Sequence, residues 1–294
     1  MVATKISTID ADGVQIFYRS AGPATAPTIV LQHGFPSSSH MFRNLIPLLA
    51  TRYRVIAPDL PGFGFTQVPA DRNYKYTFAS LTQTFTAFVD ALKLTSFAVY
   101  IFDYGAPTAL RFALQRPDSI AAIISQNGNA YEDCIDKNVW APFAKLWVNN
   151  PAQTDRDAAE DFALGLPFTL FQYQDGSPHP QDIPPEALYL DQALLERPGN
   201  KATQLDLLTD YQTNIALYPE FHEYFRSHPE LPVLTAWGKN DKIFIAPGAE
   251  AFKRDVKNLE TKWLDAGHFA LETNEAQMAE GIFDFLEKYN VFKD

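Results

Sequence analysis

An acidic side chain stands at a sharp turn between an apolar strand and a helix. The strand Phe97–Phe102 stops at Asp103, Gly105 follows two residues later, and a helix-like stretch runs over 108–115. A strand-to-helix turn with a small residue at this place has the geometry of a nucleophile elbow, which holds one side chain exposed at the top of a sheet. A carboxylate in that position is suited to attack saturated carbon, displacing a halide or opening an epoxide.

A histidine after the last predicted strand is the best candidate for a catalytic base. Attack by a carboxylate leaves a covalent ester, and only an activated water can hydrolyse it. His268, in the run Asp265-Ala-Gly-His, is expected on a loop at the carboxyl end of the sheet, beside Asp103. None of the other histidines matches that position as well, including His40, His179, His222 and His228.

An acidic residue should orient the imidazole and stabilise its protonated form. Asp241 lies just past another predicted strand, at the end of the run Trp237-Gly-Lys-Asn-Asp, and is the first candidate for this role. Glu132 or Asp133, which follow the preceding strand, could take the role instead.

Hydrolysis of the ester also requires donors for the negative oxygen of the tetrahedral intermediate. Next to a nucleophile elbow, one backbone N–H comes from the residue after the nucleophile, here Tyr104. The other comes from a loop after an earlier strand. That loop reads His33-Gly-Phe-Pro, so Phe35 is the second candidate donor.

The elements that must position these residues alternate between strand and helix. Strands are predicted at Val14–Arg19, Thr28–Gln32, Arg54–Ala57, Phe97–Phe102, Ile120–Ser125, Pro232–Trp237 and Glu260–Leu264. Helices are predicted at Met41–Ala50, Phe78–Leu92 with Thr77 as its N-cap, Ala246–Val256 and Ala276–Tyr289. This alternation predicts an α/β fold, a mostly parallel sheet with helices on both faces.

The alternation breaks in the middle of the chain. From about Asp133 to His228 the sequence has helical segments and many prolines, and no convincing strand. We therefore predict a first part of the core at 1–132, a helical insertion at 133–228 and a second part of the core at 229–294. No repeat, low-complexity tract or detachable linker accompanies the insertion.

The composition is that of a soluble globular protein, with 46% hydrophobic and 20% charged residues. The net charge of −11 disfavours nucleic acid and anionic membranes as partners, because both are polyanions. The single cysteine, Cys134, cannot form an internal disulfide, and residues 1–10 lack the apolar core of a signal peptide. No apolar run approaches the roughly 20 residues of a membrane-spanning helix. A cytoplasmic location is the expectation.

These features together resemble the α/β-hydrolase superfamily, in the branch of epoxide hydrolases and haloalkane dehalogenases. Five motifs in the expected order carry the resemblance: His33-Gly-Phe-Pro, Asp59-Leu-Pro-Gly-Phe-Gly, Asp103 in the elbow, Trp237-Gly-Lys-Asn-Asp, and Gly267-His268. The chain order of nucleophile, acid and histidine is also that of α/β-hydrolases. The resemblance implies an eight-stranded sheet with a helical cap, and the insertion at 133–228 falls where that family carries its cap.

The reactants implied by the resemblance are a small organic substrate and water, without a cofactor. Gly62 and Gly64 form only a turn, and no third glycine follows at the spacing of a dinucleotide fingerprint, so no nicotinamide or flavin is expected. No cluster of histidine, cysteine and carboxylate residues has metal-ligand spacing, so no metal is expected either.

The leaving group distinguishes the two activities of the branch. An opened epoxide becomes an alkoxide that needs a proton, which epoxide hydrolases supply from tyrosines of the cap. Haloalkane dehalogenases instead bind the halide, usually with a tryptophan after the nucleophile and a second tryptophan or an asparagine. Here those positions are Tyr104 and Phe35, which favours the epoxide. By resemblance, Tyr211 in the segment 208–214 is the first candidate proton donor, and Tyr173, in an ambiguous match over 168–173, is the second.

Several alternatives stay open. Asp103 could be an ordinary helix N-cap, and Tyr211 could serve packing alone. Trp140 and Trp147 are expected to pack cap helices, yet either indole N–H could bind a halide, which keeps a haloalkane or haloacid dehalogenase as the second function. A specialised natural-product hydrolase or lyase could use the same three residues. A non-catalytic ligand-binding protein could share the fold, although the intact set of Asp103, Asp241 and His268 speaks against it.

Overall fold

One mixed sheet forms the centre of the molecule. The computed structural model describes residues 2–148 and 151–292, and within these the sheet has eight strands in the order β1-β2-β4-β3-β5-β6-β7-β8. The strands are β1 (Lys5–Ala11), β2 (Val14–Ala21), β3 (Thr28–Gln32), β4 (Arg54–Pro58), β5 (Phe97–Phe102), β6 (Ile120–Gln126), β7 (Pro232–Gly238) and β8 (Asn258–Leu264). The pairs β1–β2 and β2–β4 are antiparallel and all others are parallel, which confirms the predicted mostly parallel sheet.

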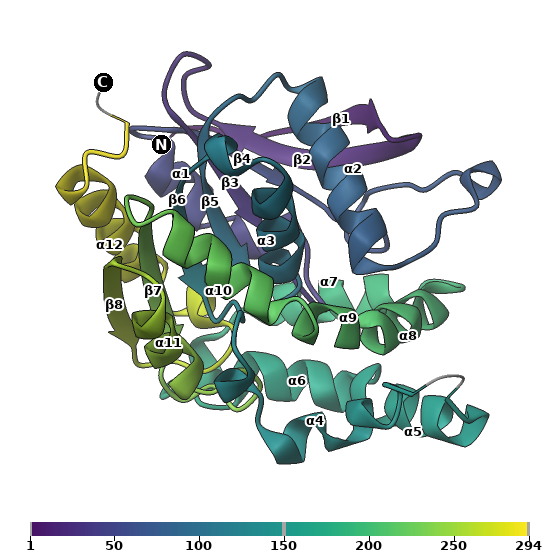
Figure 1. Ribbon diagram of the computed structural model, residues 1–294. Helices are drawn as coiled ribbons and strands as arrows, with labels where there is room; N and C mark the ends of the chain where they lie inside the picture. Colours follow the sequence, from purple (N-terminus) through teal and green to yellow (C-terminus); the bar gives the residue numbers. More distant parts are fainter. Residues whose placement is uncertain (1, 149–150, 293–294) are drawn as a thin grey trace.

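Helices cover both faces of this sheet, as Figure 1 shows. Along β5 the side chains alternate between the faces, because successive residues of a strand point to opposite sides. Ala98, Tyr100 and Phe102 belong to the apolar cluster that includes α1 (Leu45–Leu49) and α12 (Glu275–Lys288). Val99 and Ile101 belong to the cluster that includes α2 (Phe78–Ala91) and α3 (Gly105–Gln115). A strand buried on both faces explains why the run 97–102 is apolar throughout.

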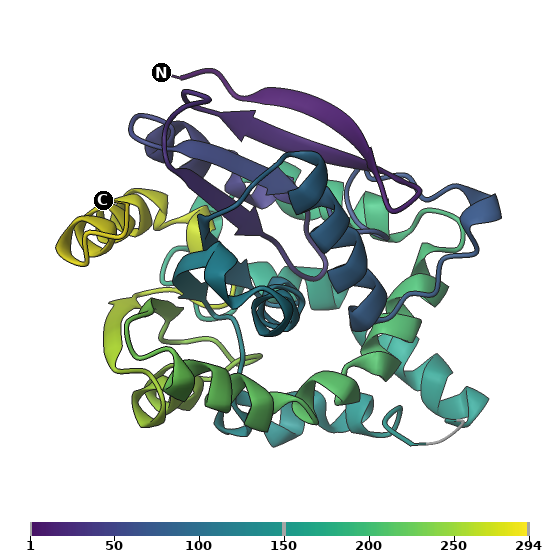
Figure 2. The same cartoon turned by 45° about the horizontal axis from the view of Figure 1, so that its top comes forward.

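The segment between β6 and β7 is helical. Its described residues form α4 (Lys137–Ala144), α5 (Gln153–Ala163), α6 (Leu166–Gln174), α7 (Pro185–Leu195), α8 (Asn200–Asp210), α9 (Gln212–Ile215) and α10 (Tyr218–Ser227). In Figure 1 the helices α4 to α9 lie together below β1–β5, and α10 lies beside α3; Figure 2 shows the same helices from another angle. The division of the chain into core and cap at 132 and 228 stays a prediction. A short helix, α11 (Pro247–Ala251), follows β7. Among the described helices, none has the length and apolarity needed to span a membrane.

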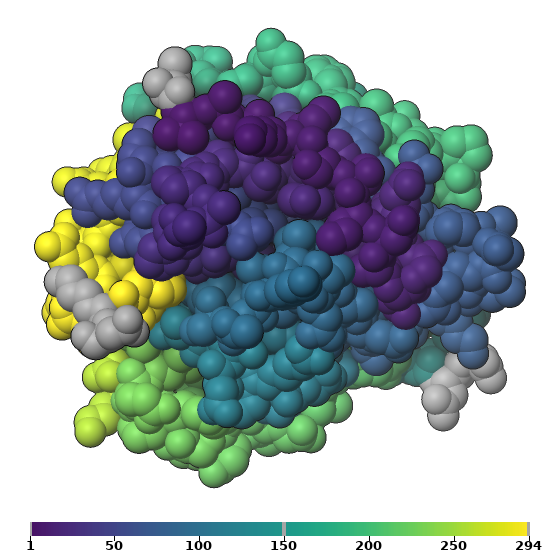
Figure 3. Space-filling view, turned by 90° about the horizontal axis from the view of Figure 1, so that it is seen from above, coloured from purple at the N-terminus to yellow at the C-terminus, as the bar shows by residue number. Residues whose placement is uncertain are grey.

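Two local expectations differ from the structure. The strand β1 was not predicted, because it lies at the edge of the sheet and its exposed residues, such as Ile6 at 65% exposure, give no alternating apolar pattern. The segment is visible on the surface in Figure 3. The predicted helix over 41–50 is instead a 3₁₀ turn at Ser39–Phe42 followed by α1. Pro47 explains the break, since inside a longer α-helix it would lack an N–H and clash with the carbonyl of residue 43.

Candidate active site

Asp103 occupies the turn between β5 and α3. Its backbone has φ +47°, in the left-handed region that few residues other than glycine, asparagine and aspartate adopt. Gly105 allows the turn, because a Cβ there would meet the carbonyl oxygen of Gln32 at 2.5 Å. Asp103 is buried, with 4% of the residue exposed. The chain therefore holds a carboxylate in a strained turn at the carboxyl end of a central strand, a geometry typical of functional sites.

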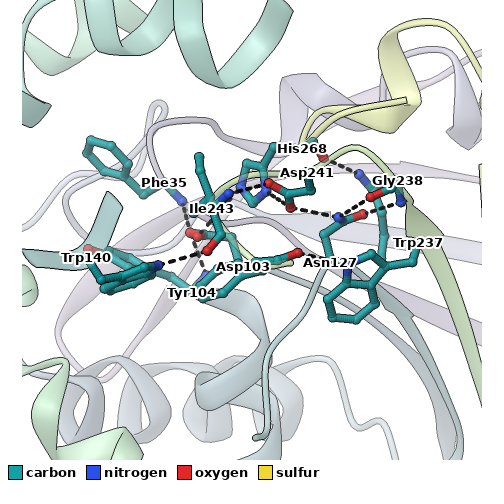
Figure 4. A network of polar contacts seen from close by, with 12 residues as sticks. Phe35, Asp103, Tyr104, Asn127, Trp140, Trp237, Gly238, Asp241, Ile243 and His268 are labelled. Carbon is teal, nitrogen blue, oxygen red and sulfur yellow. Dashed lines mark hydrogen bonds and ion pairs between the residues drawn. The ribbon is translucent and has the colours of Figure 1, made fainter. Parts of the chain in front are cut away.

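Two backbone N–H groups converge on one oxygen of this carboxylate. The amide of Phe35 donates to Asp103 Oδ1 at 2.6 Å and the amide of Tyr104 donates to the same oxygen at 2.7 Å, as drawn in Figure 4. Gly34 makes this approach possible, since a Cβ on it would come within 2.4 Å of the Asp103 side chain. The two residues chosen from the sequence as oxyanion donors thus lie together, on the loop after β3 and at the start of α3.

His268 and Asp241 lie on the other side of Asp103. The imidazole Nδ1 of His268 lies 2.7 Å from Asp241 Oδ2, and its Nε2 lies 3.8 Å from Asp103 Oδ2. Nε2 is buried and has no hydrogen-bond partner among the described residues. Asp241 Oδ1 accepts the N–H of Ile243 at 2.7 Å, which fixes the carboxylate. The Nδ1 hydrogen bond holds the tautomer in which Nε2 can accept a proton from water.

Asn127 is a member of the site that the sequence reasoning missed. It follows β6, donates from Nδ2 to Asp241 Oδ2 at 2.7 Å, and accepts the N–H of Gly238 at 2.9 Å. Figure 4 shows it bridging Asp241 and the end of β7. The sequence signal that could have indicated Asn127 is an Asn-Gly turn directly after a predicted strand, at the edge of the sheet where the other site residues lie. Asn127 thus fixes the position of the Asp241 carboxylate, which in turn orients the His268 imidazole.

The alternative acids lie outside this network. Glu132 and Asp133 are both exposed, and Asp133 forms an ion pair with Arg254 at 2.5 Å. Of the three acidic candidates from the sequence, Asp241 is the one that contacts His268.

Burial and neighbouring charges shift the pKa values of the site. Burial raises the pKa of Asp103 to about 6, and His268 and the two backbone N–H donors only partly offset it. Burial lowers the pKa of His268, but the Asp241 carboxylate reverses this, so that the net pKa is raised. The hydrogen bonds to the Asp103 anion replace only part of the hydration that burial removes. The buried carboxylate is therefore more reactive than an exposed one.

Tyr211 lies next to the turn that carries Asp103. Its ring is 5.9 Å from that of Tyr104, the residue after Asp103. Burial raises the pKa of the Tyr211 phenol well above its ordinary value, and the Asp103 carboxylate adds a smaller contribution in the same direction. Two contacts across the helices hold it there. Asp210 accepts the N–H of Phe78 at the start of α2 at 2.7 Å, and Arg111 of α3 donates to Asn214 at 3.0 Å.

The polar groups of Tyr173, Trp140 and Trp147 all have hydrogen-bond partners within the protein. The hydroxyl of Tyr173 donates to Asp191 at 2.5 Å, and its ring stacks on Phe269. Its proton is thus directed at a buried carboxylate and not at Asp103. The indole N–H of Trp140 donates to the carbonyl of Ile243 at 2.9 Å, and that of Trp147 donates to the carbonyl of Leu208 at 3.0 Å. Both tryptophans pack beside Tyr211, but neither N–H is free to bind a halide.

The alternatives to Tyr173 in the ambiguous segment offer no donor. The rings of Phe168 and Phe171 lie 5.7 Å apart, and Phe168 packs against Phe162.

Apolar rings surround the reacting groups. The ring of Phe102 lies 4.6 Å from that of His268, and the ring of Phe244 lies 5.9 Å from it. Apolar side chains around the site suit an apolar substrate. They also exclude water, which strengthens electrostatic interactions between the reacting groups.

The sequence matches the family described as alpha/beta hydrolase fold over residues 27–275, and the chain therefore belongs to that family. It is an α/β-fold hydrolase, and the family expected from the five motifs is confirmed.

Individual relatives carry several activities. The chain is 48% identical to the uncharacterized hydrolase YNR064C of Saccharomyces cerevisiae, covering 92% of this chain and 93% of the relative. It is 28% identical to epoxide hydrolase 3 of Siraitia grosvenorii, covering 96% and 98%. Among solved structures, the haloalkane dehalogenase DatA of Agrobacterium tumefaciens C58 matches with a TM-score of 0.80 at 21% identity, covering 98% of this chain and 97% of the other. At that identity the likeness shows the fold alone.

Proposed function

We propose that this hydrolase opens epoxides to vicinal diols through a covalent ester on Asp103. The observation that carries the proposal is the position of Tyr211, whose ring lies 5.9 Å from that of Tyr104, the residue after Asp103, while both candidate halide-binding indoles donate to backbone carbonyls. An opened epoxide needs a proton, which a tyrosine supplies, whereas a halide needs free N–H donors. The full-length relationship to an epoxide hydrolase supports the same choice.

In the first step, Asp103 Oδ2 attacks one carbon of the epoxide. Oδ1 is engaged by the amides of Phe35 and Tyr104, so Oδ2 is the oxygen left to react. The carbon–oxygen bond of the ring breaks, and the departing oxygen takes the proton of Tyr211. The products of this step are a hydroxyalkyl ester on Asp103 and the phenolate of Tyr211.

In the second step, His268 takes a proton from water, and the hydroxide adds to the carboxyl carbon of Asp103. The negative charge then develops on Oδ1, where the two amides already point. The ester bond breaks, His268 returns its proton to the departing alkoxide, and the diol is complete. The proton remaining on the new carboxyl group of Asp103 restores Tyr211, so that epoxide and water are the net reactants.

A parallel screen of epoxides and halogenated alkanes tests the proposal. Diol and halide release are measured together on the same enzyme preparation. Diol formation from epoxides, with halide release at least a hundredfold slower, is the expected result. Halide release as the dominant activity would instead establish the dehalogenase function.

The rate should fall in acid because both reacting groups must be deprotonated. Asp103 attacks only as the anion, and burial raises its pKa to about 6, so ester formation is expected to decline as the pH falls through about 6. His268 must be neutral for the second step, and Asp241 raises its pKa. In Asp241→Asn the acid limb of ester hydrolysis should therefore move to lower pH while the maximal rate drops. Pre-steady-state rates measured from pH 4 to 9 check both statements. An acid limb unmoved by Asp241→Asn would contradict the assigned role of Asp241.

Replacing Tyr211 by phenylalanine should slow ester formation by roughly 10²- to 10³-fold, the usual range for removal of a general acid. Hydrolysis of the ester should change little, since Tyr211 acts in the first step. Rapid quenching followed by intact-protein mass spectrometry measures the first step directly. Tyr224→Phe is the matched control, because the Tyr224 hydroxyl is buried on α10 without a hydrogen-bond partner among the described residues. An ester formed equally fast in Tyr211→Phe would remove this residue from the mechanism.

A further inference from the structure

His33 stands directly before the peptide group that supplies one of the two oxyanion donors. Gly34 and Phe35 share this peptide group, and its N–H donates to Asp103 Oδ1. His33 is fully buried and has no place in the mechanism described above. Both nitrogens of its imidazole have backbone partners. Nε2 lies 2.9 Å from the backbone nitrogen of Leu60, and Nδ1 lies 3.1 Å from the carbonyl oxygen of Gly34.

These two contacts fix the tautomer of the imidazole. A backbone N–H can only donate, so Nε2 must accept the N–H of Leu60. A neutral imidazole carries one proton, which therefore lies on Nδ1 and is donated to the Gly34 carbonyl. Burial keeps the ring neutral, because it lowers the pKa of His33 below its ordinary value. The directions of both hydrogen bonds thus follow from a backbone donor that cannot accept.

The Gly34 carbonyl and the Phe35 N–H belong to one planar peptide group. In a trans peptide the C=O and the N–H point in opposite directions, so a hydrogen bond that holds the carbonyl also directs the N–H. The backbone N–H of Ser37 donates to the same carbonyl at 2.9 Å. His33 adds a hydrogen bond from a side chain, and this is the one that a substitution can remove.

The glycine explains why this peptide group needs a restraint. A Cβ on Gly34 would come within 2.4 Å of the Asp103 side chain, so the close approach of the loop to the nucleophile requires glycine. Glycine also restricts the backbone least of all residues, and the peptide group that follows it can turn at little cost. A turned peptide group would direct the Phe35 N–H away from Asp103. The hydrogen bond from His33 supplies the restraint that glycine lacks.

We propose that His33 is a positioning residue of the oxyanion site, which holds the Gly34 carbonyl so that the Phe35 N–H points at Oδ1 of Asp103. The inference rests on the proposed function, in that it requires the covalent ester on Asp103. In the second step negative charge develops on Oδ1, and an N–H that is already in place stabilises this charge without reorganisation. Hydrolysis of the ester is therefore the step that depends on His33.

Two substitutions separate the two hydrogen bonds of the ring. The amide of asparagine reaches the position of Nδ1, so His33→Asn still donates to the Gly34 carbonyl but leaves the Leu60 N–H without its partner. The longer amide of glutamine reaches the position of Nε2, so His33→Gln still accepts from Leu60 but no longer donates to Gly34. His222→Gln is the matched control, because His222 is a half-buried histidine whose Nε2 lies 2.9 Å from the carbonyl oxygen of Ala130, outside the site.

Single turnovers at pH 8, quenched and analysed by intact-protein mass spectrometry, time the formation and the loss of the ester separately. Styrene oxide is the probe, followed by the best epoxide of the screen. In His33→Gln, ester hydrolysis is expected to slow by roughly 10- to 100-fold, less than for complete removal of an oxyanion donor, because Ser37 still holds the carbonyl. Ester formation should change by no more than about threefold, so that the ester accumulates.

The asparagine variant should behave in the opposite way. His33→Asn and His222→Gln are expected to hydrolyse the ester within about threefold of the parent rate, since neither loses the hydrogen bond to Gly34. His33→Asn should nevertheless lower Tm, because it leaves a buried N–H unpaired. A merely structural role of His33 would instead make the loss of rate follow the loss of stability.

The pH dependence of ester formation gives a second readout. The Phe35 N–H helps to lower the pKa of Asp103, so a misdirected N–H raises that pKa. The acid limb of ester formation is therefore expected to move to higher pH in His33→Gln and to stay in place in His33→Asn. Rates of the first step, measured over the acid limb in both variants, check this statement.

The outcomes separate this inference from the function on which it rests. If the ester forms but His33→Gln hydrolyses it as fast as His222→Gln does, the inference is wrong and the proposed function stands. A slowing of roughly 10-fold or more in His33→Asn overturns the inference on its own, whether or not His33→Gln folds. If no ester forms in the parent enzyme or in His268→Gln, the covalent scheme of the proposed function fails, and the inference fails with it.

Discussion

Replacing Asp103 by asparagine is expected to lower the rate of epoxide hydrolysis by roughly 10⁴-fold or more, the scale of loss when a nucleophile is removed. Asparagine keeps the shape of the side chain and is among the few residues that tolerate the positive φ of this turn. Its amide oxygen can still accept the two N–H groups. The neutral amide, however, is a poor nucleophile toward carbon. Steady-state diol formation checks the loss, and no ester should appear by mass spectrometry.

The same substitution should stabilise the folded protein at pH 8. The pKa of Asp103 is raised in the folded state to about 6, which means that the buried anion costs stability. That cost is fully present above about pH 6 and disappears as the pH falls below the ordinary pKa of an aspartate. Removing it at pH 8 is worth on the order of 3 kcal/mol. A rise in Tm at pH 8 that vanishes near pH 4 is the expected result. A large fall in Tm would show that inactivity reflects lost folding and not lost chemistry.

His268→Gln is expected to stop turnover after one equivalent of substrate. The first step needs Asp103 and Tyr211, so the ester should still form at a rate near that of the parent. The second step needs a base for water, and overall turnover should fall by roughly 10³-fold or more. Intact mass should increase by the mass of one epoxide, and peptide mapping should locate the addition on Asp103.

His179→Gln is the matched control for this experiment, because His179 is an exposed histidine of the segment between α6 and α7. It should turn over like the parent and show no trapped adduct. An enzyme with His268→Gln that releases diol at the parental rate would exclude His268 as the base.

The sequence predicted most of the core because the relevant signals are local. The strands β3 and β5 are continuous apolar runs bounded by turn residues, and the structure has them at the predicted residues. Thr77 caps α2 as expected, accepting the N–H of Ser80 at 3.2 Å. Asp103, Asp241 and His268 could be predicted to lie together because each follows a predicted strand, and the carboxyl ends of parallel strands meet at one edge of the sheet.

Other features depend on contacts between distant segments, which no local pattern encodes. Asn127 contacts Asp241 across 114 positions of the chain, and Asn129 contacts Tyr218 across 89. A tryptophan or tyrosine in the sequence does not reveal where its N–H or O–H points. Trp140 and Trp147 pack as expected, but the alternative of halide binding by their indoles and the proton-donor role of the Tyr173 hydroxyl could not be judged from the sequence, because packing of the helices decides their hydrogen-bond partners.

The most direct test of the covalent scheme is a single turnover in water enriched in heavy oxygen, with enzyme in excess over epoxide. Water attacks the carboxyl carbon of Asp103 in this scheme, so the incoming oxygen stays on the enzyme and the diol receives an old carboxylate oxygen. We expect label in the peptide that contains Asp103 and an unlabelled diol after the first turnover. Label found only in the diol, with an unlabelled Asp103 peptide, would contradict it.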